Sequence, residues 1–301
     1  MEHVKTILIG SVESSKVVLD GMVVHDYPPE MVFGLDRKYS KNVSGYVDLS
    51  VIAEENDIPH MTFKNINDDK VVEEIRLIAP DYIFVVGISQ LIKEEIISTA
   101  KKGVIGYHPT ALPKYRGRAA LPWLVLLGEK ESKTSLFFID EGMDSGDIVD
   151  QETYLIGEGD YAEDVYHASN EALGRMLRRV LKQMKNDAVE ATPQDHEKTT
   201  YLLKRTPEDG RIDWSAPAED VHRLIRATSR PYPGAFSHYR DHKVIIWRAS
   251  VHPNARYIGI PGQIIRSDSM SIDVLCTDGI LRIEDYEVDE DVRFVDGNKF
   301  K

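Results

Sequence analysis

The sequence predicts an α/β protein, in which a doubly wound, mostly parallel sheet is followed by a small β-rich, barrel-like domain. Over the first two thirds, short β-branched or aromatic apolar runs alternate with amphipathic stretches. A polar, proline-containing stretch follows, which is typical of a linker. Beyond it, several short strand-like runs are separated by turn residues. We therefore expect a first domain over residues 1–190, a linker over 191–210 and a second domain over 211–301.

The individual elements follow from the spacing of their apolar residues. Strands of the first domain should be short, apolar and closed by glycine or polar residues, as buried parallel strands are. We expect these strands over 4–9, 31–35, 82–88, 104–107 and 134–139. Helical spacing predicts helices over 14–22, 43–55, 68–78, 91–100, 119–127 and 161–184. In the second domain we expect a helix over 218–227 and strands over 235–239, 243–249, 262–266, 271–276 and 280–285.

Composition and charge exclude several classes of protein. The chain has 301 residues and a net charge of −13, so it lacks the basic surface that nucleic-acid or anionic-membrane binding requires. Its single cysteine, Cys276, excludes an internal disulfide. Residues 1–10 lack a signal peptide's long apolar stretch, and no apolar run is long enough for a membrane span. We expect a cytoplasmic protein with no membrane or nucleic-acid partner.

Two polar residues occupy positions where a doubly wound sheet binds ligands, beyond the carboxyl ends of its strands. His108 follows the run 104–107, and Asp144 comes shortly after the run 134–139. If both runs are parallel strands, both side chains emerge at the same edge of the sheet. A carboxylate beside an imidazole fixes its tautomer and favours its charged form. This pairing is typical of a general base, or of a group that stabilises developing charge.

Other catalytic patterns are missing from the sequence. The first strand is followed by Gly10-Ser11 instead of G-x-G-x-x-G, so a nicotinamide cofactor is unsupported. There is no P-loop, no G-x-S-x-G elbow and no Cys/His spacing that predicts a metal site. A single histidine or a turn aspartate is more often structural than catalytic, so the interpretation of His108 and Asp144 depends on the pattern around them.

That pattern resembles the signature of the folate-dependent formyltransferases. The resemblance is carried by Gly-Tyr-His-Pro-Thr-Ala-Leu-Pro-Lys-Tyr-Arg-Gly over 106–117 and Gly-Met-Asp-Ser-Gly-Asp-Ile over 142–148. Residues 204–214 and 231–236 are similar to the stretch that joins the two domains in methionyl-tRNA formyltransferases and their sugar-modifying relatives. The resemblance implies formyl transfer from 10-formyltetrahydrofolate to an amine, with His108 and Asp144 as catalytic residues and no metal.

The resemblance also implies where the folate binds. In this family the pterin lies between the strand ends and the loop that carries the catalytic aspartate. The corresponding lining residues, expected to contribute mainly backbone groups, are Ile88, Ser89, Gln90, Ile139, Asp140, Glu141 and Gly142.

One position departs from the family pattern Asn-x-His, because the asparagine is replaced by Gly106. The missing amide would donate to the formyl oxygen, and losing one such donor costs about 10²–10³-fold in rate. Three interpretations stay open. Gln90 or a water supplies the donor, the reaction depends more on the imidazolium form of His108, or the chain is a catalytically impaired folate- or sugar-nucleotide-binding protein.

The acceptor is expected to be a nucleotide-linked amino sugar, with initiator methionyl-tRNA as the alternative. The segment 36–44 is short and lacks the long basic insertion of the tRNA enzymes, and residues 206–301 contain 13 Lys and Arg against 16 Asp and Glu. Candidate sugar-nucleotide ligands are Ser11, Lys114, Arg116 and Arg118. For Ser11 the alternative is helix capping, and for Arg116 it is bracing of its own loop. A homodimer is possible through the second domain.

Overall fold

The computed structural model describes residues 4–254, 256–289 and 292–301. They form two compact units. Unit 1 comprises Met1–Ala120, Glu131–Leu155 and His167–Leu202, and unit 2 comprises Leu121–Lys130, Ile156–Tyr166 and Leu203–Lys301. The units interleave along the chain, and the division between Leu202 and Leu203 falls inside the stretch expected to be a linker.

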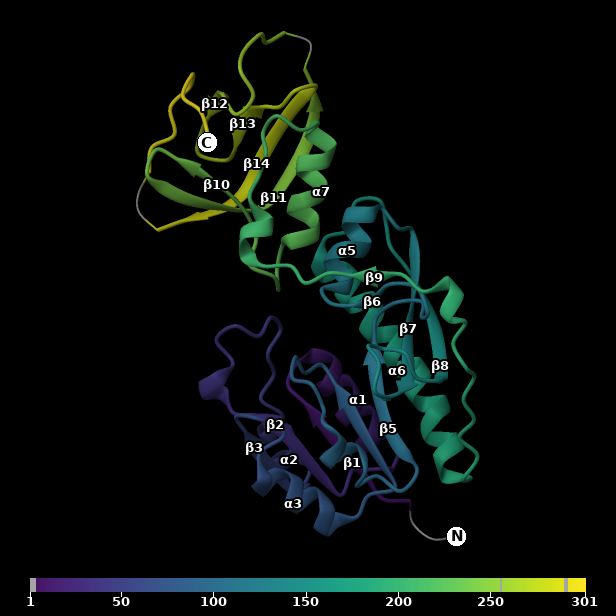
Figure 1. Ribbon diagram of the computed structural model, residues 1–301. Coiled ribbons are helices and arrows are strands. Elements are labelled where there is room, and N and C mark those ends of the chain that lie inside the picture. Colours follow the sequence, from purple (N-terminus) through teal and green to yellow (C-terminus); the bar gives the residue numbers. More distant parts are fainter. Residues whose placement is uncertain (1–3, 255, 290–291) are drawn as a thin grey trace. The chain divides into compact units, whose positions relative to one another are not determined.

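Unit 1 is built on a seven-stranded sheet in the order β3-β2-β1-β4-β5-β7-β8 (Figure 1). Its strands are β1 (Thr6–Gly10), β2 (Met31–Leu35), β3 (His60–Phe63), β4 (Tyr82–Val86), β5 (Gly103–His108), β7 (Glu131–Phe138) and β8 (Ile148–Leu155). Strands β1 to β5 pair in parallel, which confirms the doubly wound, mostly parallel fold. The order reverses between β1 and β4, and this is where such sheets open a crevice for ligands.

Strand β7 corrects one expectation, because it runs antiparallel to β5 and β8 runs antiparallel to β7. The apolar pattern of a strand reports that both faces are buried and carries no information about direction. The loop 139–147 between β7 and β8 is too short for the crossover that parallel neighbours need, so β8 must run antiparallel to β7. Because β7 itself runs antiparallel to β5, the end of β7 lies beside the start of β5, where Phe138 pairs with Ile105.

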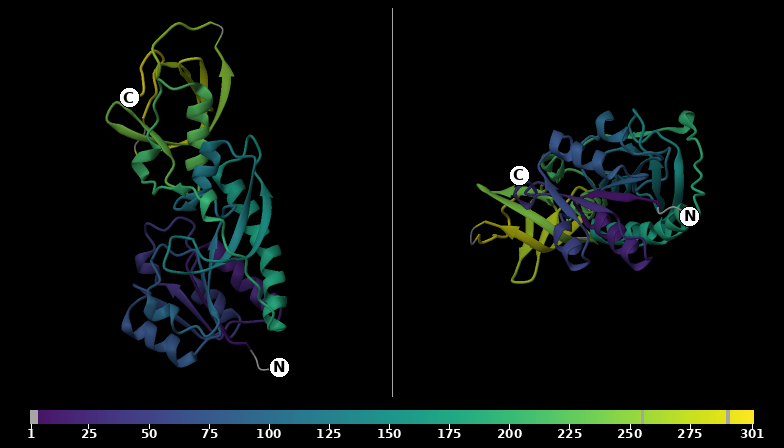
Figure 2. Two further views of the ribbon diagram at one scale, coloured as in Figure 1. Left: turned by 45° about the vertical axis from the view of Figure 1, so that its right-hand side comes forward. Right: turned by 90° about the horizontal axis from the view of Figure 1, so that it is seen from below.

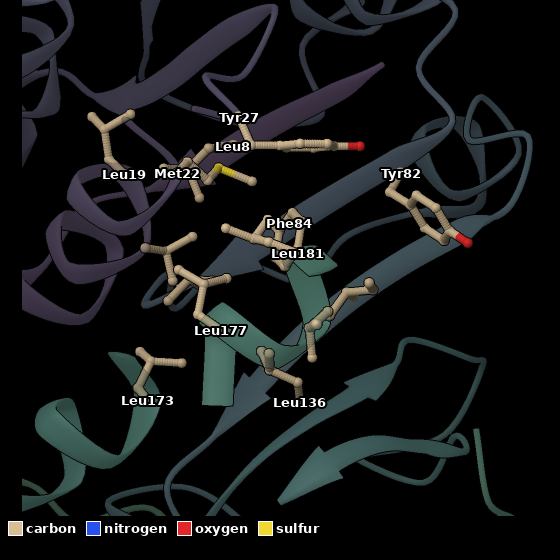
Figure 3. Packing of buried hydrophobic residues seen from close by; sticks show 14 of the residues in the cluster. Leu8, Leu19, Met22, Tyr27, Tyr82, Phe84, Leu136, Leu173, Leu177 and Leu181 are labelled. Carbon is tan, nitrogen blue, oxygen red and sulfur yellow. The ribbon is translucent and has the colours of Figure 1, made fainter. Parts of the chain in front are cut away.

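Helices cover both faces of this sheet (Figures 1 and 2). They are α1 (Glu13–Val24), α2 (Leu49–Glu55), α3 (Asp69–Ile78), α4 (Glu94–Ile97) and α6 (Ala162–Lys185). The short 3₁₀ helix η1 (Arg37–Tyr39) follows β2, and α5 (Ala120–Leu127) lies almost wholly in unit 2. Side chains of α1, α2 and α6 share one buried cluster, and those of α3 and α4 share another on the opposite face. Figure 3 shows Leu173, Leu177 and Leu181 of α6 among the residues that pack with Leu8 and Phe84 of the sheet.

Two strands of the sheet were not expected from the sequence, and two helices are shorter than expected. β3 and β8 form the two edges, and edge strands carry polar side chains that weaken the apolar signal. Helix α2 begins at Leu49, where Asp48 caps it, so the expected start at 43 was wrong. Helix α4 is confined to Glu94–Ile97 within the expected 91–100.

Two segments after α6 return to unit 1. The 3₁₀ helix η2 (His196–Lys198) is followed by β9 (Tyr201–Leu202), which pairs in parallel with β6 (Arg116–Gly117). This small ladder attaches the region near 200 to the loop that follows β5.

Unit 2 is an antiparallel five-stranded sheet in the order β10-β11-β14-β13-β12, packed against α7 (Ala218–Thr228). The 3₁₀ helix η3 (Pro207–Gly210) precedes α7, and the strands are β10 (Ala235–Tyr239), β11 (His242–Pro253), β12 (Ile264–Ser267), β13 (Ile272–Leu275) and β14 (Gly279–Val288). The last residues bridge both edges, since Phe300 pairs with Tyr239 and Lys299 pairs with Gln263. This closure confirms the expected barrel-like domain.

Candidate active site

His108 is the last residue of β5, and the structure fixes the roles of its two ring nitrogens. Its Nε2 lies 2.7 Å from the carbonyl oxygen of Tyr115. Because a carbonyl only accepts, Nε2 must carry the hydrogen of this bond. His108 is 6% exposed, so the imidazole is held inside the protein. Nδ1 is therefore the ring nitrogen that carries no hydrogen when the imidazole is neutral.

Asp144 faces that nitrogen, with its Oδ2 3.8 Å from Nδ1 of His108. This distance is longer than a hydrogen bond but short enough for ion-pair attraction. The same oxygen accepts a 2.7 Å hydrogen bond from the backbone N–H of Gly117. The Asp144 side chain is 21% exposed and that of His108 is 8% exposed, so the carboxylate is the more accessible of the two groups. An imidazolium at His108 would thus find an oxygen acceptor beside each of its N–H groups.

The two residues meet by a different route from the one expected. Since β7 is antiparallel to β5, Asp144 does not emerge from a parallel strand end. Instead, the loop 139–147 brings it back toward the end of β5, with Asp144 itself in the left-handed region at a φ of 51°. The expected juxtaposition of His108 and Asp144 is present, although its geometric premise was wrong.

The Tyr115 carbonyl is aimed at His108 by a strained turn. Tyr115 has a φ of 63°, which is unfavourable for a bulky side chain and persists only where the surroundings hold it. Its N–H donates to Oγ1 of Thr200 at 2.9 Å, and its carbonyl also accepts from Oγ1 of Thr110 at 3.2 Å. The Thr110 hydroxyl donates in addition to the carbonyl of Lys114 at 3.0 Å.

The space that an asparagine side chain would need at position 106 is filled. Gly106 pairs across the sheet with Phe137. A Cβ at Gly106 would lie 2.9 Å from Cζ of Phe137 and 3.0 Å from Cγ1 of Ile139. Phe137 is buried, so its ring has little room to move. A side chain at position 106 would therefore press against the Phe137 ring.

Gln90 is engaged elsewhere. Its Oε1 accepts from the N–H of Ile66 at 2.7 Å, and its Nε2 donates to the carbonyl of Lys64 at 2.8 Å. These bonds connect the segment after β4 to the segment after β3. The described contacts of Gln90 do not bring it to His108 or Asp144.

The apolar residues expected at the pterin pocket lie at the border of one core. Ile88 and Ile139 are both partly buried against the cluster that fills the α3 and α4 side of the sheet. Ile88 and Ser89 follow β4, and the Ser89 side chain is exposed.

The polar residues expected at that pocket shape the loop that carries Asp144. Oδ1 of Asp140 accepts from the N–H of Gly142 at 3.0 Å and from the hydroxyl of Ser145 at 2.6 Å. Glu141 is exposed. A Cβ at Gly146 would lie 1.9 Å from the carbonyl oxygen of Phe138, so this position requires glycine.

The four candidate sugar-nucleotide ligands divide into two groups. Lys114 and Arg118 are exposed beside the loop that holds His108. Ser11 is 2% exposed, and its hydroxyl donates to the carbonyl of Gly87 at 2.8 Å. Arg116 is also 2% exposed, and its guanidinium donates to Oε1 of Gln194, with an Nη2 distance of 2.6 Å. Both side chains are thus engaged within the protein, but not in the ways expected. Ser11 does not cap helix α1, whose N-cap residue is Val12, and Arg116 braces the segment of Gln194 and His196 instead of its own loop.

Sequence reasoning missed Gln194, Thr110 and Thr200. Gln194 lies in the polar stretch expected to be a linker, where only its low hydrophobicity is visible from the sequence. Its contacts, like those of Thr200, form between segments far apart in the chain. No local spacing reports such contacts.

Within the part of the chain that the structure describes, no cluster of three or more His, Cys, Asp or Glu side chains is arranged to hold a metal ion. The helices of the same residues include none long and apolar enough to traverse a bilayer.

Two family models match the chain. The one described as "Formyl transferase" matches residues 30–181, which is half of the chain. The one described as "Formyl transferase, C-terminal domain" matches residues 204–293. The first contains His108 and Asp144, and the second contains most of the barrel-like sheet.

Solved structures share the same architecture. HypX from Aquifex aeolicus, in complex with tetrahydrofolic acid, has a TM-score of 0.68 at 20% identity, over 94% of this chain and 44% of that chain. The chain thus spans less than half the length of HypX. An N-formyltransferase from Helicobacter canadensis, in complex with folinic acid and dTDP-3-aminofucose, has a TM-score of 0.65 at 18% identity, over 94% of this chain and 100% of that chain. Methionyl-tRNA formyltransferase from Clostridium thermocellum has a TM-score of 0.61 at 20% identity, over 95% and 100% respectively.

Proposed function

Because the chain belongs to the formyl transferase family, we propose that it moves a formyl group from 10-formyltetrahydrofolate to the amine of a nucleotide-linked amino sugar. The observation that carries the proposal is the pair of His108 and Asp144, held 3.8 Å apart within the matched residues. The folate donor is supported by the Aquifex aeolicus and Helicobacter canadensis structures, whose ligands are tetrahydrofolic and folinic acid.

In the proposed reaction the amine attacks the formyl carbon. A new C–N bond forms, the bond from the formyl carbon to N10 of the folate breaks, and N10 takes up a proton as tetrahydrofolate leaves. Meanwhile the amine loses a proton, and negative charge builds on the formyl oxygen. The site must therefore accept one proton and stabilise one oxyanion.

His108 and Asp144 are suited to those two tasks. Nε2 of His108 is committed to the Tyr115 carbonyl, so proton exchange takes place at Nδ1. Asp144 stabilises the imidazolium electrostatically and is itself kept in place by the N–H of Gly117. The proton that the amine loses passes to this pair and from it to N10 of the folate.

Gly106 shifts the stabilisation of the oxyanion onto His108. A side chain at position 106 would meet Phe137 and Ile139, and Gln90 already donates to the carbonyl of Lys64. Of the interpretations left open by the sequence, the one that agrees best with these contacts is donation to the formyl oxygen from Nδ1–H of the His108 imidazolium, which lies too far from Asp144 for a hydrogen bond.

The folate would bind at the loop after β4 and at the loop that carries Asp144. Ile88 and Ile139 offer partly buried apolar surface there, which fits the flat pterin. The Asp140 carboxylate holds this loop by accepting hydrogen bonds from Gly142 and Ser145. Backbone groups of the loop would then form the hydrogen bonds to the pterin ring.

A sugar nucleotide is favoured over tRNA by three features. The Helicobacter canadensis structure, which contains dTDP-3-aminofucose, has a higher TM-score (0.65) than the Clostridium thermocellum tRNA enzyme (0.61), and both are covered over their full length. The segment between β2 and α2 forms only the three-residue η1 and contains no long basic insertion. Residues 206–301 carry a net charge of −3, from 13 basic and 16 acidic residues. Lys114 and Arg118 are exposed and are the residues we assign to the pyrophosphate.

The test is formyl transfer from 10-formyltetrahydrofolate to a panel of UDP- and dTDP-linked 3-amino and 4-amino sugars, with charged methionyl-tRNA as a competing acceptor. We expect release of tetrahydrofolate with one sugar nucleotide. Turnover with tRNA alone would overturn the assignment of the acceptor. Folate binding without turnover by any acceptor would show a catalytically impaired binding protein.

A further inference from the structure

The side chain of Gln194 lies in the centre of a buried network behind the candidate active site. Gln194 is 5% exposed, and both ends of its amide are used. Nε2 donates to the carbonyls of Asp144 at 2.9 Å and Gly146 at 2.6 Å. Oε1 accepts from Nη2 of Arg116 at 2.6 Å and from its Nε at 3.2 Å. Gln194 falls between the residues matched by the two family models, which end at 181 and begin again at 204.

Gln194 is held in place by its own segment. Two residues before it, Thr192 exchanges two 2.8 Å backbone hydrogen bonds with Ile148 at the start of β8. On the other side, Nη2 of Arg116 also donates to Nδ1 of His196 at 3.2 Å. The network is therefore attached to the sheet at one end and to η2 at the other.

The network joins the two loops that carry the catalytic pair. Arg116 directly follows Tyr115, whose carbonyl fixes His108. Asp144 and Gly146 belong to the loop that presents the carboxylate. Gln194 thus connects the loop of Tyr115 and Arg116, which orients the imidazole, to the loop of Asp144, and so fixes the distance between the two loops.

The chemistry of the connection requires a glutamine. Two carbonyls on one side need two N–H donors, and a guanidinium on the other side needs an acceptor. A glutamate would keep the bond to Arg116 but would place a carboxylate against the carbonyls of Asp144 and Gly146. A methionine would keep the volume and lose all four hydrogen bonds.

We propose that Gln194 is a positioning residue, which acts through Asp144 to set the distance and angle between Asp144 and His108. Gln194 does not reach the reacting atoms. The inference rests on the proposed function for its kinetic consequence, because the rate of formyl transfer is what the positioning serves.

The kinetic test compares Gln194→Glu and Gln194→Met with the unchanged chain. Misplacing a catalytic group by about 1 Å costs on the order of 10²-fold in rate. We therefore expect kcat to fall by about 10²-fold in both variants, while KM for either substrate changes by less than about 3-fold. The matched control is Gln263→Glu, because Gln263 also bridges loop backbone, accepting from Ile260 and donating to Gly297, but in unit 2. An unchanged kcat in both Gln194 variants would overturn the proposal.

A double-mutant cycle with Asp144→Asn separates positioning from general stabilisation. If Gln194 acts through Asp144, Gln194→Glu should cost little further rate once the Asp144 charge is gone. Additive losses would contradict the proposal, because they would mean that Gln194 supports the rate independently of Asp144.

A measurement without turnover keeps this inference distinct from the proposed function. The imidazole resonances of His108 are identified by their loss in His108→Ala. We expect them to move in Gln194→Met and Gln194→Glu, and to stay in place in Gln263→Glu. If the unchanged chain transfers no formyl group, the proposed function fails while this arm still tests the positioning. Unmoved His108 resonances in the two folded Gln194 variants would overturn the inference.

Discussion

At the residue scale, the His108 imidazole lies between two oxygen acceptors, the carbonyl of Tyr115 and the carboxylate of Asp144. His108→Ala and Asp144→Ala should each lower kcat by about 10²–10⁴-fold, because general acid–base catalysis contributes a factor of this size. Asp144→Asn should lower kcat by a similar factor while an amide oxygen still accepts from Gly117. Stopped-flow single-turnover assays measure the rate, and thermal unfolding checks that the fold is retained. A folded variant with near-normal kcat would show that this pair is not the catalytic one.

Restoring the family's asparagine at position 106 should not restore a donor. Gly106→Asn forces the new Cβ against Phe137 and Ile139, at 2.9 and 3.0 Å. Overpacking of a buried site costs about 1–3 kcal/mol. We expect Gly106→Asn to lower the free energy of unfolding by that amount, measured by urea denaturation, without raising kcat.

The control for this prediction makes room for the amide. Phe137→Val removes the ring, so Gly106→Asn should be better tolerated in that background and the two changes should couple favourably. If the double variant is no more stable than the sum of the single changes implies, Phe137 does not fill the amide position. A rise in kcat in the double variant would show that the site still accepts the family's donor.

The role of a residue could be predicted from the sequence where the residue belongs to a recognisable motif after a strand. It could not be predicted where the role depends on a partner far away in the chain. His108 and Asp144 stand out because their neighbours match a pattern. Arg116 also stands out, but the sequence cannot show that its guanidinium donates hydrogen bonds to Gln194, a residue 78 positions away, inside the protein. For the same reason the sequence predicted Gln90 as a donor to the formyl oxygen, whereas both ends of its amide are engaged with the backbone of Lys64 and Ile66.

At the scale of elements, the parallel strands β1, β2, β4 and β5 were predictable because both of their faces are buried. The edge strands β3 and β8 have one polar face, so their apolar signal is weak. The direction of β7 was not predictable, since direction depends on how the chain returns to the sheet. The position of Asp144 therefore follows from a loop and not from a strand end.

The packing of α1 against α6 gives a further prediction. A Cβ at Gly21 of α1 would lie 2.6 Å from Cδ2 of Leu177 of α6. In a helix that packs against nothing, replacing glycine by alanine raises the stability of the helix by about 1 kcal/mol. Here we expect Gly21→Ala to destabilise unit 1 by about 1–2 kcal/mol, because Leu177 is fully buried and cannot move away. Urea unfolding followed by circular dichroism at 222 nm measures the change.

Leu177→Ala provides the check on that packing. Alone it should cost about 2–5 kcal/mol through the cavity that it leaves. Combined with Gly21→Ala it should cost less than the sum, since the added methyl partly fills the cavity. A stabilising Gly21→Ala would mean that the two helices are farther apart than the structure places them.

At the scale of the whole molecule, the two units can be followed separately. All three tryptophans, Trp123, Trp214 and Trp247, belong to unit 2. Intrinsic tryptophan fluorescence therefore reports the unfolding of unit 2. The circular dichroism signal at 222 nm also includes the large contribution of the helices of unit 1. Since two compact units can unfold separately, the two signals follow two unfolding transitions.

Unit 2 should lose stability in mild acid because of one histidine in α7. Burial, and secondarily the nearby Arg226, lower the pKa of His222 below its ordinary value of 6.5. A histidine whose folded-state pKa is lowered binds its proton more readily when unfolded, so its full contribution to stability is present above pH 6.5. That contribution is lost as the pH falls through 6.5 toward the folded-state pKa, with a slope of at most about 1.4 kcal/mol per pH unit. Fluorescence-detected urea unfolding between pH 8 and pH 5 should show this loss, and His222→Gln should reduce the slope relative to the unchanged chain. Equal slopes in the two proteins would show that another group governs the acid sensitivity of unit 2.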